Sequence, residues 1–443
     1  MTEQLLGRPR PVFAWNSVVD SANLTATFTS TLEGTIMKNI ARIARLLGLI
    51  TGIGCTSAAA AVGPYTITDL GTLGGMQAGA YDVNASGQVT GYATIPGDTP
   101  APTPNNPNTY YAFRYSNGTM TNLSTLGGPT SVGAAINDAG QVTGSSETTQ
   151  HWMDRYGNKY YYDHAFLYSN GTMTDLGTLP GYLKSSGSGI NNAGHVVGYS
   201  SDPVIEGNPS YRAFLYKDGA MSELGTLGGP TSSANDINDA GQVTGSASLP
   251  GNTGTHAYLY TNGTMTDLGT LEGHTFSSGY AINASGQVTG ISSTYGSASP
   301  TYSHAFLYSG GLMTDLGTLG GKNSYPNDIN ASGQIVGRSE YSGGFFYHAF
   351  LYSDGSMIDL NSLLPPGSPW LFLEGARGIN DAGQIVGYGR MLFNGVEQRR
   401  AFLMTPVPLP SAAWLLASGF LGLIGSTWRG TQKRLARRHP LSR

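Results

Sequence analysis

A unit of 45 to 54 residues recurs seven times along the chain, and this repeat constrains the fold more than any other feature. Each copy contains an Ile-Asn or Val-Asn step, followed later by an Ala-Phe or Ala-Tyr step. The asparagines of the first step are Asn84, Asn137, Asn191, Asn238, Asn283, Asn330 and Asn380. The aromatic residues of the second step are Phe113, Phe166, Phe214, Tyr258, Phe306, Phe350 and Phe402. Repeats of this length are typical of supersecondary units that bury their apolar faces against their neighbours.

Each copy carries four short segments that are typical of β-strands. They are rich in β-branched and aromatic residues, and Gly, Asn, Asp or Ser bounds them. One copy, for example, has the segments 234–238 and 241–245, followed by a HAFLYS-like and an MTDLG-like run. Four antiparallel strands in each of seven repeats predict an all-β fold, a seven-bladed β-propeller of four-stranded blades.

The connections between these segments support the same fold. An N-x-x-G turn, as in 137–140, joins the first and second strands, and a turn such as Asn170-Gly171 joins the third and fourth. Asn-Gly is a strong hairpin signal because a type I′ turn needs two residues with positive φ. Both tight turns are expected on one face of the propeller, and the longer connections on the opposite face.

The two ends of the repeat array predict that the propeller closes on itself. The array begins near Tyr65 with a fourth-strand segment and ends near Arg399 with a third-strand segment. The N-terminal strand is therefore expected to complete the last blade, which removes exposed sheet edges that would template aggregation. The third-strand aromatics and fourth-strand leucines are expected to form the core between blades.

Composition excludes some classes of partner and cross-link. The repeat region, residues 62–406, carries 12 basic and 24 acidic residues, and this net charge of −12 opposes binding to nucleic acid. The chain contains a single cysteine, Cys55, so a disulfide framework is excluded.

The segment before the repeats is predicted to contain a signal peptide. Residues 1–36 lack clear periodicity and are interpreted as a non-native upstream extension. In residues 37–61, Lys38 and two arginines precede an apolar run, Leu46–Ile53, and then a stretch of alanines. This order is typical of a signal peptide, here cleaved after Ala61, although an amphipathic surface helix is the alternative. The export machinery is therefore an expected partner.

The segment after the repeats, residues 407–443, is predicted to anchor the chain in a membrane, at least transiently. The uncharged run Ser411–Trp428 is long enough to span a bilayer. Arg429 and four further basic residues follow it closely, so the positive-inside rule places the C-terminus in the cytoplasm. Both ends of the chain therefore predict that the repeats lie outside the inner membrane.

The repeats resemble the HAF family of extracellular repeats through steps such as Ala165-Phe166, Ala305-Phe306 and Ala349-Phe350, each preceded by histidine. The C-terminal segment resembles a PEP-CTERM sorting signal, with Leu where the founding motif has Glu between the prolines. The residues of the expected signal are Val407, Pro408, Leu409, Pro410 and Arg429. This resemblance implies a Gram-negative bacterium, an exosortase-type sorting enzyme as a partner, and delivery to the cell surface or to an extracellular polysaccharide matrix.

One connection between a second and a third strand, residues 145–163, is distinguished by its aromatic content. Long loops on one face of a rigid ring are common binding sites, and Trp and Tyr rings suit stacking on sugars such as those of an exopolysaccharide. A solvated polar loop is the alternative. The expected ligand-binding residues are His151, Trp152, Tyr156, Tyr160, Tyr161 and Tyr162.

Other polar residues give no sign of a metal, a cofactor or a catalytic centre. The histidines before the Ala-aromatic step lie on separate blades in the expected fold, whereas metal ligands must converge. These histidines are His164, His256, His304 and His348. The pattern D-x-N-x-x-G, as in 82–87, faintly resembles a calcium loop, but a bulged hairpin explains its Asn and Gly. The sequence contains neither G-x-S-x-G nor H-E-x-x-H.

These observations favour an exported, non-catalytic propeller protein of the cell surface or extracellular matrix that binds glycan or protein partners. The alternative is a secreted enzyme, a lyase or hydrolase acting on polysaccharide, for which His151, Asp154 and Arg155 would supply acid–base groups. The near-identity of the repeats favours the first hypothesis, because an enzyme usually breaks its symmetry with acids on several blades. Carboxylates clustered in the central channel would favour the enzyme instead.

Overall fold

The computed structural model describes residues 64–97, 109–202, 211–294, 302–342 and 346–407, which belong to one compact unit. Residues 1–63, with the expected signal peptide and its cleavage after Ala61, lie outside the described residues, as does the apolar run 411–428. Of the expected sorting signal, only Val407 is described, and Pro408, Leu409, Pro410 and Arg429 are not. Among the described residues, no helix is long and apolar enough to cross a membrane.

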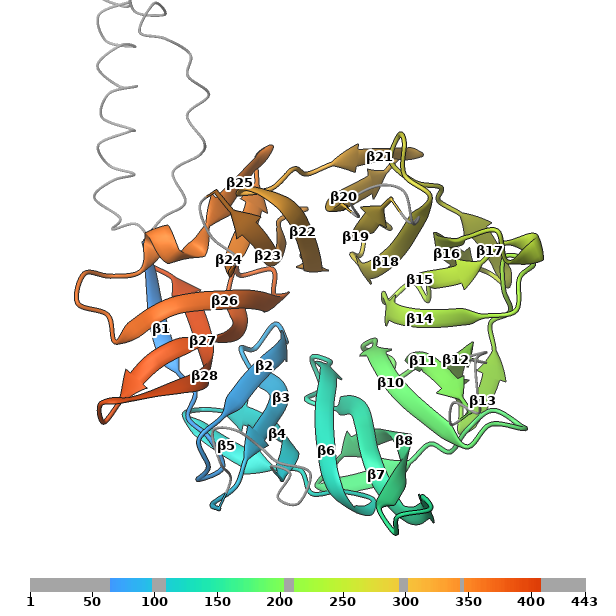
Figure 1. Ribbon diagram of the computed structural model, residues 1–443, viewed down its shortest axis with the longest axis horizontal. Helices are drawn as coiled ribbons and strands as arrows, with labels where there is room; N and C mark the ends of the chain where they lie inside the picture. Colours follow the sequence, from blue (N-terminus) through green and yellow to red (C-terminus); the bar gives the residue numbers. More distant parts are fainter. Residues whose placement is uncertain (1–63, 98–108, 203–210, 295–301, 343–345, 408–443) are drawn as a thin grey trace, which may run out of the picture. The chain divides into compact units, whose positions relative to one another are not determined.

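The described chain forms seven antiparallel sheets of four strands each, arranged around a central axis as the blades of a propeller (Figure 1). This confirms the predicted all-β fold, its seven blades and its four strands per blade. The only helical segments among the described residues are two short 3-10 helices, η1 (Pro250–Asn252) and η2 (Leu360–Leu363).

The strands of each blade follow here from the innermost to the outermost. Blade 1 contains β2 (Ala78–Val83), β3 (Val89–Thr94), β4 (Tyr110–Ser116) and β5 (Thr119–Asn122). Blade 2 contains β6 (Gly127–Ile136), β7 (Val142–Met153), β8 (Lys159–Ser169) and β9 (Thr172–Asp175). Blade 3 contains β10 (Lys184–Ile190), β11 (Val196–Ser201), β12 (Tyr211–Lys217) and β13 (Ala220–Glu223). Blade 4 contains β14 (Ser232–Ile237), β15 (Val243–Ser248), β16 (Thr255–Thr261) and β17 (Thr264–Asp267).

The remaining three blades repeat this arrangement. Blade 5 contains β18 (Phe276–Ile282), β19 (Val288–Ser293), β20 (Ser303–Ser309) and β21 (Leu312–Asp315). Blade 6 contains β22 (Gly320–Ile329), β23 (Ile335–Tyr341), β24 (Tyr347–Ser353) and β25 (Ser356–Asp359). Blade 7 contains β26 (Trp370–Ile379), β27 (Ile385–Phe393), β28 (Val396–Pro406) and, as its outermost strand, β1 (Tyr65–Asp69).

The ring closes as the sequence predicts, because the first strand of the chain completes the last blade. β1 pairs antiparallel with β28, with Tyr65 opposite Pro406 and Asp69 opposite Phe402. An ion pair of 2.7 Å between the Asp69 carboxylate and the Arg400 guanidinium spans the same two strands. The outermost strand of blade 7 therefore comes from the opposite end of the repeat array to its other three strands.

The tight turns have the predicted geometry. Asn170 and Gly171 both have positive φ, 52° and 83°, as a type I′ turn requires. In the N-x-x-G turn of the same blade, the Gly140 N–H donates to the Asn137 carbonyl at 2.9 Å. Because strand direction alternates, all these turns share one side of the propeller, named here the turn face. The connections between second and third strands share the opposite side, named the loop face.

Apolar side chains pack between neighbouring blades and form the core. Leu123, which follows β5 of blade 1, packs against Ile136, Val142 and Phe166 of blade 2. The seven third-strand aromatic residues have no exposed surface: Phe113, Phe166, Phe214, Tyr258, Phe306, Phe350 and Phe402. Burial of one such side chain contributes about 1.5–3 kcal/mol. This confirms the prediction that these residues and the fourth-strand leucines hold the blades together.

Candidate functional site

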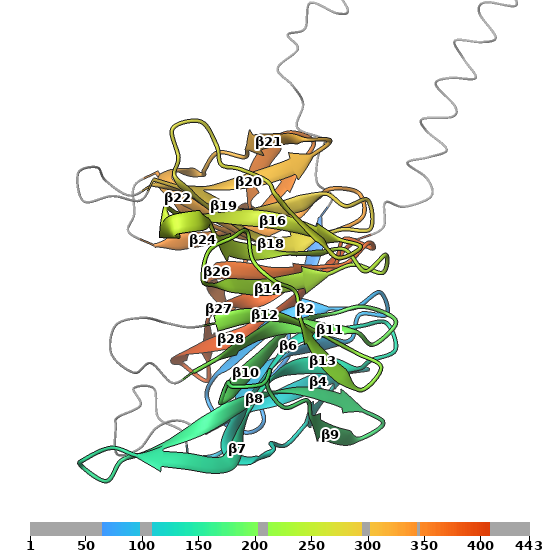
Figure 2. The same cartoon turned by 90° about the vertical axis from the view of Figure 1, so that its right-hand side faces the viewer.

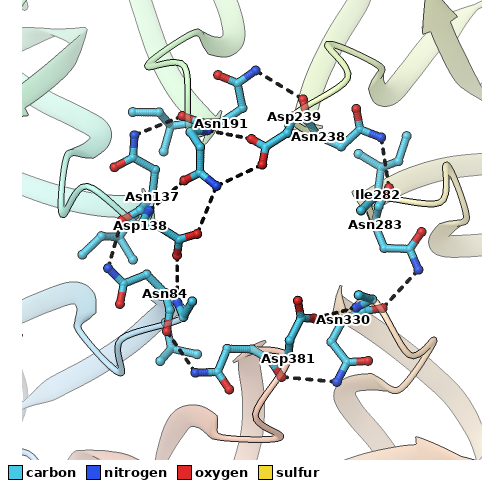
Figure 3. Close-up of a pocket in the computed structure, with 18 of the residues that line it drawn as sticks. Asn84, Asn137, Asp138, Asn191, Asn238, Asp239, Ile282, Asn283, Asn330 and Asp381 are labelled. Carbon is cyan, nitrogen blue, oxygen red and sulfur yellow. Dashed lines mark hydrogen bonds between the residues drawn. The ribbon is translucent and has the colours of Figure 1, made fainter.

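The asparagines of the Ile-Asn and Val-Asn steps form a closed ring around the axis at the turn face (Figure 3). Each Nδ2 donates a hydrogen bond of 2.9–3.2 Å to the backbone carbonyl of the equivalent asparagine in the next blade. Asn380 of blade 7 completes the ring by donating to Asn84 of blade 1 at 2.9 Å. The repeat sequence thus places one such hydrogen bond, named here the inter-blade clasp, at every blade junction.

Each ring asparagine also organises its own turn. Asn283 Oδ1 accepts the backbone N–H groups of Ser285 and Gln287 at 3.1 and 3.0 Å, which closes an Asx turn. Its Nδ2 donates to Gln287 Oε1 at 2.8 Å as well as to the next blade. One buried carboxamide therefore fixes both the turn and the blade junction.

The residue after each ring asparagine lies at the rim of the channel. Asp138, Asp239 and Asp381 accept backbone N–H groups of the preceding blade at 2.8–2.9 Å. The Asn192 carboxamide donates to Asp138 and Asp239 at 3.0 and 2.9 Å. The rim and ring enclose a first axial cavity of about 240 Å³ on the turn face. The Asp that follows a ring asparagine thus accepts a hydrogen bond that joins two neighbouring blades.

Three further aspartates, Asp82, Asp236 and Asp328, lie deeper along the axis. The Asp236 carboxylate accepts the N–H of Ile237 at 2.8 Å and, from the next blade, the N–H of Ile282 at 2.9 Å. Asp82 and Asp328 bridge their blade junctions in the same way. Burial raises the pKa of Asp82 to about 6, of Asp236 to about 7 and of Asp328 to about 8.

Carboxylates on several blades therefore line the channel. From the sequence alone, such a cluster is an observation that would favour an enzyme. Both oxygens of each deep aspartate already accept a backbone N–H. Among the described residues, no three His, Cys, Asp or Glu side chains lie close enough together to hold a metal ion. Each deep aspartate therefore joins its own pair of neighbouring blades.

Every innermost strand contains a β-bulge two positions before the Val or Ile that precedes the ring asparagine. In blade 1, Ala80 pairs with Gly91 and Asp82 with Thr90, so Tyr81 between them has no partner. The seven bulge residues are Tyr81, Ala134, Ser188, Asn235, Tyr280, Asn327 and Arg377. All seven line a second axial cavity of about 130 Å³, which shares no lining residue with the first.

The bulge residues differ from blade to blade, although the Val or Ile and the Asn that follow are nearly constant. This is the part of the channel where the repeats lose their symmetry. Sequence reasoning missed it, because a bulge is defined by pairing with the neighbouring strand. The signal in the sequence was one position that varies between repeats, within a run of residues that is otherwise nearly constant.

The segment 145–163 is a long β-hairpin, and its interpretation as a loop is wrong. β7 and β8 extend beyond the other strands of the ring and project from the loop face (Figure 2). The Asp154 carboxylate closes the tip by accepting the N–H groups of Tyr156 and Asn158 at 2.8 and 2.9 Å. Both strands are rich in β-branched and aromatic residues, which pair across the hairpin and explain why strands form here.

The hairpin divides the six expected ligand-binding residues into separate groups. Trp152 stacks on Tyr160 across the strands, with centroids 4.5 Å apart and planes 17° apart. His151 lies against Tyr161 at 5.5 Å, and strand alternation puts this pair on the other side of the hairpin. Tyr156 is at the tip, and alternation puts Tyr162 on the Trp152 side. The structure therefore brings Trp152 and Tyr160 together but does not gather all six.

The repeat histidines pair with acids of the neighbouring strand instead of converging. His164 Nδ1 lies 2.9 Å from the Asp175 carboxylate, and this hydrogen bond raises the pKa of His164. The equivalent pairs are His256–Asp267, His304–Asp315 and His348–Asp359, at 2.7–2.9 Å. Where Arg replaces His, as in Arg212–Glu223, an ion pair of 3.2 Å takes its place. Each of these histidines therefore pairs across strands within its own blade.

One comparison with known protein families finds a match over part of the chain. Residues 125–227, which include blades 2 and 3, match a family described as "Protein of unknown function (DUF3466)". No curated protein matches the sequence.

Solved structures match the chain at low identity. TolB from Acinetobacter baumannii is 14% identical with a TM-score of 0.40, over 61% of this chain and 62% of that protein. Acylaminoacyl peptidase from Pyrococcus horikoshii is 11% identical with a TM-score of 0.44, over 73% and 52%. Trypanosoma rangeli sialidase is 10% identical with a TM-score of 0.35, over 86% and 64%. The matches span less than two thirds of each of these proteins and concern the fold alone.

Proposed function

We propose that the protein is exported and acts, without catalysis, as a glycan-binding propeller of the cell surface or extracellular matrix. The observation that carries this proposal is the stacked pair of Trp152 and Tyr160, whose side chains remain 40% and 43% exposed on paired strands. Rigid, exposed aromatic faces offer a large contact area to a sugar ring at little cost in conformational entropy. The proposed partners are the export machinery, an exosortase-type sorting enzyme and an exopolysaccharide.

The position of the chain ends supports display of this hairpin away from a membrane. The Val407 N–H donates to the Pro64 carbonyl at 2.8 Å, so both ends leave the propeller side by side at the turn face. The aromatic hairpin projects from the loop face. A membrane anchor after Val407 would therefore hold the turn face toward the membrane and leave the hairpin outward.

The second candidate function is a polysaccharide lyase or hydrolase, and the raised pKa values of the deep aspartates favour it. These carboxyls would need a free oxygen facing the substrate to act as acid or base. Both oxygens of Asp82, Asp236 and Asp328 are instead engaged by backbone N–H groups. We therefore place catalysis second.

Replacement of both stacked rings, Trp152→Ala with Tyr160→Ala, is expected to weaken retention on an exopolysaccharide affinity column about tenfold or more. Aromatic anchors in interfaces typically contribute about 2 kcal/mol each, and about 1.4 kcal/mol corresponds to tenfold. His151→Ala with Tyr161→Ala, on the other side of the same hairpin, is the matched control and should leave retention nearly unchanged. Equal losses in both variants, with intact melting curves, would contradict a site at the stacked pair.

Export and sorting predict that the native protein lacks the segment before about Val62. If a sorting enzyme acts, it also lacks everything after about Ser411 and is found in the surface or matrix fraction. If that enzyme does not act, the C-terminal segment remains as a membrane anchor. Mass spectrometry of the protein from fractionated cells measures both ends. An intact chain from Met1 to Arg443 in the cytoplasmic fraction would refute the proposal.

A further inference from the structure

We propose that the second axial cavity binds a neutral, hydroxyl-rich ligand, a monosaccharide or the terminal sugar of a chain. This inference rests on the proposed function for its choice of sugars, but it concerns a site separate from the aromatic hairpin. The site consists of the seven bulge residues, one from each blade.

The bulges are the first argument for a site. A bulge leaves one residue without a partner in the sheet and turns its side chain in a new direction, and bulges are frequent beside binding sites. Here a bulge is retained at the same position in all seven blades. The redirected side chains reach the axis, and they are the ones that vary. A purely structural repeat has no need for five different residue types at one position.

Polar groups along the cavity wall are the second argument. Tyr81, Ser188 and Tyr280, which line the cavity, carry hydroxyl groups, and Arg377, which also lines it, has a buried Nε without a hydrogen-bond partner. These four groups come from blades 1, 3, 5 and 7, so they surround the cavity. Burial raises the pKa of Tyr81 and Tyr280 to about 12, which keeps both phenols protonated at neutral pH. A hydroxyl-rich ligand offers these hydroxyls both donors and acceptors.

The remaining bulge residues hold this arrangement in place. The Asn235 carboxamide donates to the Gly279 carbonyl of the next blade at 2.6 Å, and Asn327 donates to Ala376 at 2.7 Å. Arg377 Nη1 donates to Asn327 Oδ1 at 3.3 Å. The Arg377 guanidinium also lies 5.3 and 5.5 Å from the ring centres of Tyr81 and Tyr388. The Arg377 guanidinium is therefore held in place before a ligand arrives.

The charges in the cavity select a neutral ligand. Arg377 would repel a cation, and the deep aspartates would repel an anion when they are ionised. Hydroxyl groups suit the lining, since each can accept from Arg377 or a tyrosine and donate to an acceptor. The cavity of about 130 Å³ is roughly ten times the space that one ordered water needs, which is sufficient for one sugar ring.

The small bulge residues determine where the free space of the second axial cavity lies. Ala134 and Ser188 are on the adjacent blades 2 and 3, whereas the larger residues Tyr81, Tyr280 and Arg377 are on other blades. A larger side chain at position 134 should therefore fill the cavity without removing any hydrogen bond. Ser at position 134 repeats what the neighbouring blade already has.

Calorimetric titration of the full chain in mild detergent with neutral monosaccharides, and with glucuronate and glucosamine as charged counterparts, tests this site. We expect saturable binding of at least one neutral sugar over its charged counterparts. Ala134→Leu should abolish it, whereas Ala134→Ser should retain it. Tyr280→Phe, which removes only a hydroxyl, should weaken binding about five- to tenfold.

Three results would overturn the inference: no saturable binding of any neutral sugar, preference for a charged sugar, or wild-type binding by Ala134→Leu. Melting curves of the variants establish that they are folded, and Tyr280→Phe provides a second variant if Ala134→Leu does not fold. Failure here is distinguishable from failure of the proposed function. If the column still retains the wild-type protein but no monosaccharide binds, the axial site alone is wrong.

Discussion

Deletion of β1, residues 64–71, is expected to cost most of the free energy of unfolding of the propeller. The deletion removes the burial of Tyr65 and Leu70, worth about 1.5–3 kcal/mol each, and the complete ladder along β28. It also leaves Arg400, 7% exposed at its side chain, without its Asp69 partner. The sum approaches the whole stability of a typical domain, about 5–15 kcal/mol. Calorimetry should show a broad transition at a much lower temperature.

A finer variant separates the ion pair from the strand. Asp69→Ala keeps β1 but orphans the buried Arg400, and it should cost about 2–3 kcal/mol. Glu223→Ala in blade 3 is the matched control, because Arg212–Glu223 occupies the equivalent cross-strand position at greater exposure, 27% and 47%. That control should cost under about 1 kcal/mol. A melting curve unchanged by the β1 deletion would show that ring closure contributes little.

The fold was predictable because its signals are local and repeat seven times. Turns such as Asn170-Gly171 mark the hairpins, and the offset between the Tyr65 and Arg399 ends of the array indicates the closing strand. The same local reasoning failed at 145–163, where polar residues between the strands were taken as a loop. The β-branched and aromatic residues of Glu147–Met153 and Lys159–Asp163 were the signal for two longer strands, and Asp154 to Asn158 supplies their turn.

The axial site was harder to predict from the sequence, because it depends on contacts between residues of different repeats. The Asx turn of Asn283 is visible in a few residues, but its bond to Asn330 joins blades 47 positions apart. An Asx turn alone would tolerate Asp, so an amide in every repeat was the evidence for a donor role. The cross-strand pairs were also visible in the sequence. His164 and Asp175 are 11 residues apart, as are Arg212 and Glu223, and both members of the pair differ between these two repeats.

Replacement of one ring asparagine by its acid, Asn283→Asp, is expected to destabilise the protein by about 3–4 kcal/mol. The shape is unchanged, and Oδ1 still accepts from Ser285 and Gln287. The bonds from Nδ2 to Asn330 O and Gln287 Oε1 are lost, and a carboxylate, only 4% exposed, then faces two oxygens. Loss of a buried donor and burial of an unpaired charge each cost about 1–3 kcal/mol or more. Denaturation by guanidinium measures the difference.

Two further measurements identify the clasp as the cause. Asn170→Asp makes the same chemical change at an exposed turn where other repeats carry Asp218 and Asp354, and it should alter stability by less than about 0.5 kcal/mol. In Asn283→Asp, burial should raise the folded-state pKa of the new carboxyl, so stability is retained at low pH and lost as pH rises through that pKa. The difference in stability from wild type should therefore narrow as the pH falls from that pKa to about 4, because the protonated acid regains one donor. A gap that is constant with pH, or equal to that of Asn170→Asp, would exclude the inter-blade clasp as the source of stability.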